Sequence, residues 1–142
     1  MPLNVLLVED NPGEARLTLE TFRDANRGVR VHVVSDGVEA MAFLRREGAH
    51  AQAPRPALIL LDLNLPKMGG REILTQIKYD KNFRMIPTVI LTSSDAETDI
   101  RYCYEHYANC YFRKPTQWDA FGKLVKCIND LWLGLAVLPD NK

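Results

Sequence analysis

The sequence lacks any long apolar run, any excess of charge and any regular cysteine pattern. No uninterrupted apolar stretch in its 142 residues approaches the roughly 20 that a membrane-spanning helix requires. The 18 basic and 18 acidic side chains cancel, so the composition predicts no direct binding to nucleic acid or to an anionic membrane. Three cysteines fit neither a disulfide framework nor a metal spacing. We therefore expect a single reduced, cytoplasmic domain over residues 1–142, long enough to bury its own core.

Strand and helix signals alternate five times along the chain. The first helix has a clear start, because Asn11 can cap it, Pro12 suits its first position and Glu14 completes a capping-box pattern. We expect strands at residues 4–8, 30–34, 57–61, 87–91 and 109–113, and helices at 12–25, 37–47, 70–79, 95–107 and from 116 onward. Parallel strands need helical crossovers, so this alternation predicts an α/β fold. The sheet is expected to be doubly wound, parallel and five-stranded, in the flavodoxin-like order 2-1-3-4-5 with helices on both faces.

Four of the predicted strands end on polar residues that could do chemistry. Glu9 and Asp10 follow the first strand, and Asp62 follows the third. Thr92 and Lys114 follow the fourth and fifth strands. Ligands of open α/β sheets bind at the carboxyl ends of the strands, so these side chains are expected to converge on one spot.

The residue types at that spot fit metal-assisted phosphoryl chemistry. Two carboxylates about 4 Å apart repel by roughly 4 kcal/mol at an effective dielectric of 20, which favours a bound divalent cation such as Mg²⁺. An ammonium and a hydroxyl can hold phosphoryl oxygens, and a carboxylate can accept the phosphoryl group. Each feature also has a simpler interpretation: a solvated acidic rim, a surface salt bridge for Lys114 and a helix cap for Thr92.

Four motifs make the pattern specific. They are Val-Glu-Asp at 8–10, Leu-Asp-Leu-Asn-Leu-Pro at 61–66, Leu-Thr-Ser at 91–93 and Lys-Pro at 114–115. With these motifs the chain resembles the receiver domain of two-component response regulators over about residues 4–130. The resemblance implies that Asp62 is the phosphoacceptor. It also implies that Mg²⁺ (or Mn²⁺) is held by Asp10, Asp62 and the backbone carbonyl of Asn64, with Glu9 acting indirectly, partly through water.

The same resemblance implies a switch. Thr92 and Lys114 would bind the phosphoryl oxygens, and Thr92 would move toward them. Tyr111 would then turn inward, which would shift the population between two arrangements of the same fold. The family also implies a cis peptide bond between Lys114 and Pro115.

A narrower resemblance is to the stand-alone receivers that partner phytochromes, carried by residues 37–48 and 53–56. It implies a histidine kinase, plausibly a phytochrome, as partner, and signalling without an attached output domain. The protein would not be an enzyme, although autophosphatase chemistry belongs to the family. Two alternatives use the same residues: a Mg²⁺-dependent aspartyl-phosphate phosphohydrolase, and a docking module independent of phosphorylation. The first generally adds a substrate-closing cap, for which no residues remain, and the second would be expected to have lost Asp62 or Lys114.

The C-terminal helix carries an apolar stripe at helical spacing that continues into an apolar tail over residues 131–138. One helix face cannot bury all of it, and exposed apolar patches mark interaction sites. We expect a two-fold homodimer that uses Phe121, Val125, Leu131, Trp132 and Leu135. The alternative is that the tail folds back over its own domain.

Overall fold

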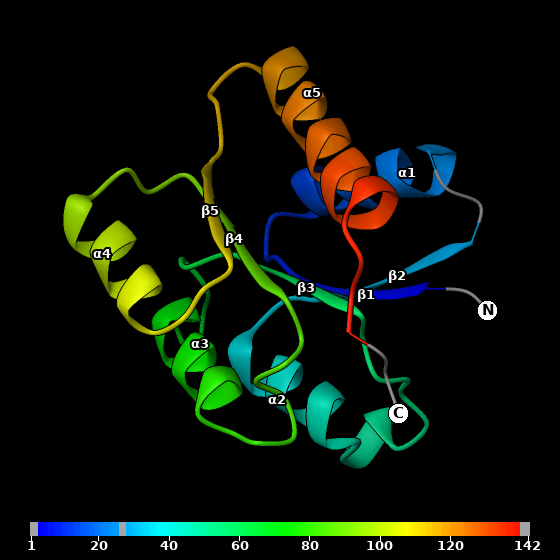
Figure 1. Cartoon of the computed structure of the whole chain (residues 1–142), viewed down its shortest axis with the longest axis vertical. Coiled ribbons are helices and arrows are strands. Elements are labelled where there is room, and N and C mark those ends of the chain that lie inside the picture. Colours follow the sequence, from blue (N-terminus) through cyan, green and yellow to red (C-terminus); the bar gives the residue numbers. More distant parts are fainter. Residues whose placement is uncertain (1–2, 26–27, 140–142) are drawn as a thin grey trace.

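The computed structural model describes residues 3–25 and 28–139, which form one parallel sheet flanked by helices (Figure 1). The strands are β1 (Leu3–Val8), β2 (Val29–Val34), β3 (Leu58–Leu61), β4 (Thr88–Thr92) and β5 (Cys110–Arg113). All neighbouring strands pair in parallel, in the order β2-β1-β3-β4-β5. The predicted order is confirmed.

Five helices cover the two faces of this sheet (Figure 1). They are α1 (Pro12–Ala25), α2 (Gly37–Arg45), α3 (Gly70–Lys78), α4 (Glu97–Glu105) and α5 (Trp118–Asn129), with a 3-10 turn at Gly48–His50 and a π-helical segment at Asp130–Leu135. Helices α1 and α5 lie side by side on one face, and α2, α3 and α4 lie on the other. Each predicted helix is present, with ends that differ by up to two residues.

The central strands β1, from Val5 onward, and β3 are apolar because both of their faces are covered. Along β1, Val5 and Leu7 point to the core under α1 and α5, whereas Leu6 and Val8 point to the core under α2, α3 and α4. β3 alternates in the same way. Period-two alternation between two buried faces therefore produces a continuous apolar run.

The start of α1 differs from a full capping box. The Asn11 Oδ1 atom accepts a hydrogen bond from the Glu14 N–H at 3.0 Å, as predicted. The Asn11 N–H, however, donates to Glu9 Oε2 at 3.2 Å, and the Glu14 carboxylate lies against Lys114 instead. Glu14 is thus available to the edge of the sheet where the strands end.

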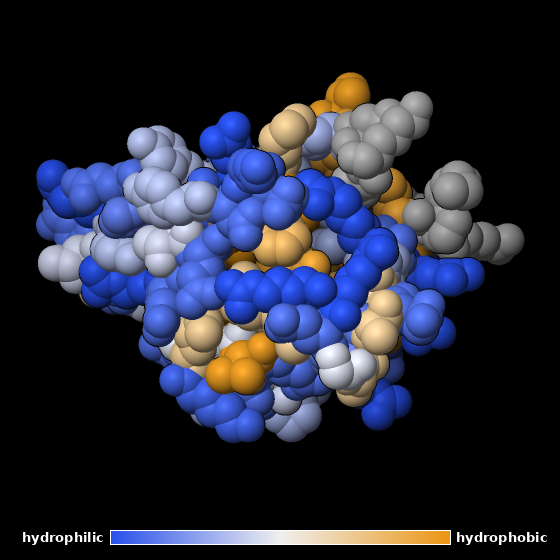
Figure 2. Space-filling model, turned by 90° about the horizontal axis from the view of Figure 1, so that it is seen from below, coloured by the Kyte–Doolittle hydropathy of each residue, from blue (hydrophilic) through white to orange (hydrophobic). Residues whose placement is uncertain are grey.

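The exterior is mostly polar at the end of the molecule that Figure 2 shows, where apolar residues appear in small groups between hydrophilic ones. Among the helices that the structure describes, none combines the length and the apolar character needed to cross a membrane.

Candidate functional site

The strand register brings the predicted side chains to one edge of the sheet. Val8 pairs with Leu61 across β1 and β3, so Glu9 and Asp62 leave neighbouring strands at the same level. The Lys114 N–H donates to the Thr92 carbonyl at 2.7 Å where β5 ends. A cleft of about 300 Å³ opens there, and it is lined by Glu9, Asp10, Asn11, Glu14, Asp62, Asn64, Ser93 and Lys114.

Lys114 lies at the centre of this cleft. Its ammonium donates to Glu14 Oε1 at 2.7 Å, to Asp62 Oδ2 at 2.9 Å and to Glu9 Oε1. The side chains of Lys114 and Asp62 are each 7% exposed and that of Glu9 is 5% exposed, so these ion pairs are shielded from water. Such buried, charge-assisted hydrogen bonds fix the side chains in one geometry.

Burial and charge act in opposite directions on these groups. Burial raises the pKa of the Glu9 carboxyl to about 7, although the hydrogen bond and positive charge of Lys114 work against that rise. Burial alone would lower the pKa of Lys114, but its hydrogen bonds to Asp62, Glu14 and Glu9 outweigh this effect and raise it. Lys114 therefore keeps its positive charge at neutral pH.

The acidic side chains fit a hard divalent cation. Carboxylate oxygens of Glu9, Asp10 and Asp62 lie within 4.8 Å of one another, and Asp10 is exposed at the mouth of the cleft. Oxygen donors with an open, solvated side suit Mg²⁺ or Mn²⁺. Four carboxylates, including that of Glu14, face one ammonium, which leaves negative charge for a cation to neutralise.

Asp62 is held in place by the loop that follows it. Its Oδ1 atom accepts a hydrogen bond from the Asn64 N–H at 3.1 Å, which leaves Oδ2 for Lys114. Gly70, at the start of α3, packs so closely that a Cβ there would lie 2.2 Å from the Asp62 carbonyl oxygen. Asn64 lines the cleft, and the metal-binding role of its carbonyl stays a prediction.

Thr92 and Tyr111 are connected through Ser94 rather than directly. Thr92 is fully buried, and its Oγ1 atom accepts a hydrogen bond of 3.5 Å from the Ser94 N–H. The Tyr111 hydroxyl donates to the Ser94 carbonyl at 2.8 Å. Ser93, not Thr92, lines the cleft.

The expected cis peptide bond before Pro115 is wrong for this structure. No peptide bond in residues 3–25 and 28–139 is cis, and the Lys114–Pro115 bond is accordingly trans. The trans form is the favoured one by about 0.5–1 kcal/mol. Lys114 reaches its three carboxylate partners with this bond trans.

Sequence reasoning missed Glu14 as a site residue. Its position three residues after Asn11 suggested a role in capping alone. A signal was available, because the first turn of a helix that follows β1 must lie above the strand ends. A carboxylate there faces the same cleft as Glu9 and Asp62.

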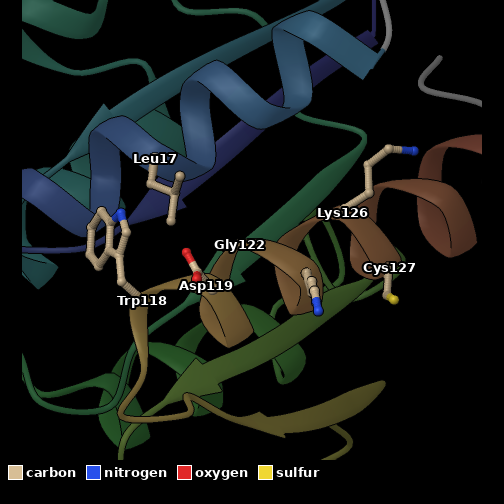
Figure 3. Close-up of a pocket in the computed structure, with 7 residues that line it drawn as sticks. Leu17, Trp118, Asp119, Gly122, Lys126 and Cys127 are labelled. Carbon is tan, nitrogen blue, oxygen red and sulfur yellow. The ribbon is translucent and has the colours of Figure 1, made fainter.

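A second hollow, of about 770 Å³, lies between α1 and α5 (Figure 3). Leu17 points from α1 toward α5, beside the ring of Trp118, which is 55% exposed. The hollow, which we name the α1–α5 groove, is lined by Leu17, Trp118, Asp119, Gly122, Lys123, Lys126 and Cys127. A Cβ at Gly13 would lie 3.5 Å from the Oδ1 atom of Asn11, which lines the cleft, and 3.9 Å from the Trp118 ring, so this end of the groove lies beside the cleft.

Comparison with known proteins agrees with this geometry. The family model of the response regulator receiver domain matches residues 5–126. The chain belongs to this family. The receiver fold, its strand order and its clustered acidic residues thus have a common explanation.

Within this family, the receiver is similar to cyanobacterial response regulators. It is 41% identical to the response regulator Rcp1 of Synechocystis over 138 residues, which cover 97% of this chain and 94% of Rcp1. The crystal structure of Mn²⁺-bound Rcp1 matches with a TM-score of 0.95 over 98% of this chain and 100% of that one, at 41% identity. The phosphorylated cyanobacterial phytochrome response regulator RcpA matches with a TM-score of 0.95 at 44% identity, covering 99% and 100% of the two chains.

The residues predicted for a dimer interface fall into two groups in the receiver. Phe121 and Val125 are buried in the core under α5 and offer no surface to a second subunit. Leu131 and Leu135, on the π-helical segment, are 44% and 80% exposed. Trp132 is half-buried, and its indole Nε1 has no hydrogen-bond partner among the described residues.

Proposed function

We propose that this receiver accepts a phosphoryl group from a histidine kinase on Asp62 and signals through the resulting conformational change. The observation that carries the proposal is the environment of Asp62: one carboxylate oxygen bonded to Lys114, the other oriented by Asn64, and two further carboxylates within reach. We also propose one receiver domain over residues 1–142 that acts in the cytoplasm, by similarity to Rcp1, of which this chain covers 94%.

The chemistry follows from these side chains. A carboxylate oxygen of Asp62 attacks the phosphorus of a phosphohistidine, the P–N bond breaks, and the released imidazole takes up a proton. Lys114 exchanges carboxylate oxygens for phosphoryl oxygens as the new negative charge develops. Asp10, Asp62 and the Asn64 carbonyl, with Glu9 indirectly, would hold a Mg²⁺ or Mn²⁺ ion, which neutralises phosphoryl charge when bound.

Hydrolysis of the acyl phosphate by water would return Asp62 to its free form. This autophosphatase reaction acts on the receiver's own phosphoryl group and not on an external substrate. The cleft is compatible with it, because Asp10 is exposed to solvent at the cleft mouth.

Intact mass spectrometry tests the proposal. The protein is incubated with Mg²⁺ and phosphoramidate, with and without a chelator. We expect a mass gain of one PO₃ group that requires the metal and is absent from Asp62→Asn. Asp119→Asn, which changes a carboxylate of the α1–α5 groove, is expected to react like the native chain. A mass gain of equal size in Asp62→Asn would refute the assignment.

A phytochrome-type histidine kinase is the proposed partner. RcpA is described as a phytochrome response regulator, and it is similar to this receiver over 99% of the chain. The α1–α5 groove offers an apolar surface beside the cleft, where a kinase that delivers a phosphoryl group to Asp62 must make contact.

We also propose a homodimer through Leu131, Trp132 and Leu135. The exposed leucines follow one another at helical spacing, and burial of apolar side chains of this size stabilises an interface. Analytical ultracentrifugation at tens of micromolar, with and without phosphorylation, is expected to show a dimer that Leu135→Asp weakens. Gly134→Ser is the control in the same segment. A native chain that stays monomeric in both states would exclude the dimer.

A further inference from the structure

Ser94 joins three parts of the molecule through three different atoms. Its N–H donates to Thr92 Oγ1 at 3.5 Å, and its carbonyl accepts from the Tyr111 hydroxyl at 2.8 Å. Its own hydroxyl donates to Asp99 Oδ2 at 2.7 Å and accepts from the Ala96 N–H at 3.3 Å. The backbone of this one residue therefore bonds to both Thr92 and Tyr111.

Asp99 holds that residue against two helices. It belongs to the first turn of α4, and its second oxygen lies 3.5 Å from the Arg71 guanidinium of α3. Arg71 in turn lies over the ring of Tyr102, with 3.9 Å between its Cζ atom and the ring centroid. The loop between β4 and α4 is thus attached to both helices through a single carboxylate.

We infer that Ser94 and Asp99 are positioning residues that couple occupancy of the phosphoryl site to the orientation of Tyr111. The inference rests on the proposed function, since the coupling matters only if a phosphoryl group enters the cleft. Thr92 and Tyr111 have no direct hydrogen bond in the described structure, and the N–H and carbonyl of Ser94 bond to one of them each. The Asp99 contact makes that connection stiff, because it fixes the Ser94 side chain to α4.

A simpler role for Asp99 would be purely local. Acidic side chains in the first turn of a helix interact favourably with its N-terminal dipole, and Asp99 occupies such a position. Glu97 lies in the same turn but has no hydrogen bond to Ser94 in the described structure. Glu97→Ala is therefore the matched control, because it removes a first-turn carboxylate and leaves the Ser94 contact intact.

The test follows the Tyr111 ring by NMR, with the signal assigned through Tyr111→Phe. Mg²⁺ and beryllium fluoride, a tetrahedral analogue of the phosphoryl group, are added to the native chain, Asp99→Ala, Ser94→Ala, Asp99→Asn and Glu97→Ala. In the native chain the analogue is expected to change the equilibrium between the two ring environments. Loss of one hydrogen bond is expected to reduce that change roughly 2- to 10-fold in Asp99→Ala and Ser94→Ala.

Asp99→Asn keeps an acceptor for the Ser94 hydroxyl and is expected to restore the native response, as is Glu97→Ala. If Asp99→Ala and Ser94→Ala respond as strongly as Glu97→Ala, the inference is overturned while phosphorylation of Asp62 still stands. If the native chain neither gains a phosphoryl group nor responds to the analogue, both proposals fall. Ser94→Ala carries the test should Asp99→Ala fail to fold.

Discussion

At the scale of single residues, the cleft is a set of charges that restrain one another. Lys114 is held by three carboxylates, so the phosphoryl group that we propose to enter the cleft would have to replace existing partners. Removing one partner of a buried ion pair costs more than removing an exposed one, since the remaining charge is left desolvated. We therefore expect the position of each carboxylate to affect the binding of the proposed cation and phosphoryl group.

Glu14 is expected to contribute to cation binding although it follows no strand. Glu14→Gln keeps a hydrogen-bond acceptor for Lys114 but removes one negative charge from the cleft. Affinity for Mn²⁺, measured by isothermal titration calorimetry, is expected to fall roughly fivefold, which corresponds to about 1 kcal/mol. Glu20→Gln, on the same helix but paired with exposed Arg16, should bind Mn²⁺ like the native chain. Equal affinities in all three proteins would exclude Glu14 from the site.

The buried ammonium of Lys78 is expected to make the free energy of unfolding increase with pH. This ammonium is buried among the carbonyls of Arg84 and Ile86, and burial lowers its pKa to about 8 from the ordinary value of 10.5. Between pH 8 and 10.5 the unfolded chain binds this proton and the folded chain does not. The free energy of unfolding should therefore increase with pH, by at most about 1.4 kcal/mol per unit.

Urea denaturation at pH 7.5 and 9.5 measures this contribution. Relative to Lys78→Met, the native chain is expected to gain stability at the higher pH. Lys81→Met, which removes an exposed lysine from the neighbouring loop, should keep the native pH dependence. Parallel pH profiles for the native chain and Lys78→Met would contradict the prediction.

At the scale of elements, the sequence was most informative where strands are buried on both sides. Continuous apolar runs located β1, β3 and β4, and the alternation with helices indicated a doubly wound parallel sheet. Such sheets have more than one common strand order, and the flavodoxin-like order that was expected is the one observed. The ends of α2, α3, α4 and α5 differed by up to two residues because caps depend on local hydrogen bonds. Helix α1 begins at Pro12 as expected, although the Asn11 N–H bonds to Glu9 rather than to Glu14.

The sequence was sufficient to predict those site residues that come directly after a strand. Asp62 and Lys114 do so, and the parallel register brings them within hydrogen-bond distance. Glu14 and Ser94 were not foreseen, because their roles depend on where a helix or loop lies above the sheet. The peptide bond before Pro115 could not be predicted from composition either, since its cis and trans forms differ by about 1 kcal/mol or less.

Gly70 connects the start of α3 to the position of Asp62. Gly70→Ala would place a Cβ 2.2 Å from the Asp62 carbonyl oxygen and 2.5 Å from the Leu63 Cα atom. Backbone atoms must then shift, so we expect a loss of about 1–3 kcal/mol in stability and slower phosphorylation by phosphoramidate.

Gly122→Ala is the matched change on α5, where a new Cβ would meet nothing within 4 Å. It should gain about 0.5–1 kcal/mol through helix propensity and react at the native rate. Thermal unfolding and the rate of mass gain distinguish the two variants. A native rate in a destabilised Gly70→Ala protein would show that Asp62 tolerates the shift.

At the scale of the whole molecule, the cleft and the α1–α5 groove are two separate hollows that share no lining residue. A small phosphodonor needs only the cleft, whereas a kinase also needs a surface on which to dock. The two kinds of donor should therefore respond differently to changes in the groove.

Trp118→Ala is expected to slow phosphorylation by a kinase without affecting phosphorylation by a small phosphodonor. Phosphotransfer from a phytochrome-type kinase should slow roughly tenfold, since exposed tryptophans at interfaces often dominate binding. The rate with phosphoramidate should stay unchanged. Tyr79→Ala, which removes an exposed aromatic side chain at the end of α3, is the control. Unchanged transfer from the kinase would place its docking surface elsewhere.

The ion pair between Glu9 and Lys114 joins residues 105 positions apart in the chain. During synthesis, a nascent polypeptide that has emerged only as far as β4 carries Glu9 and Asp62 but not Lys114. The ammonium that joins these carboxylates follows β5, the last strand to be added to the edge of the sheet. We expect an incomplete translation product to leave the carboxylates of the cleft without this partner.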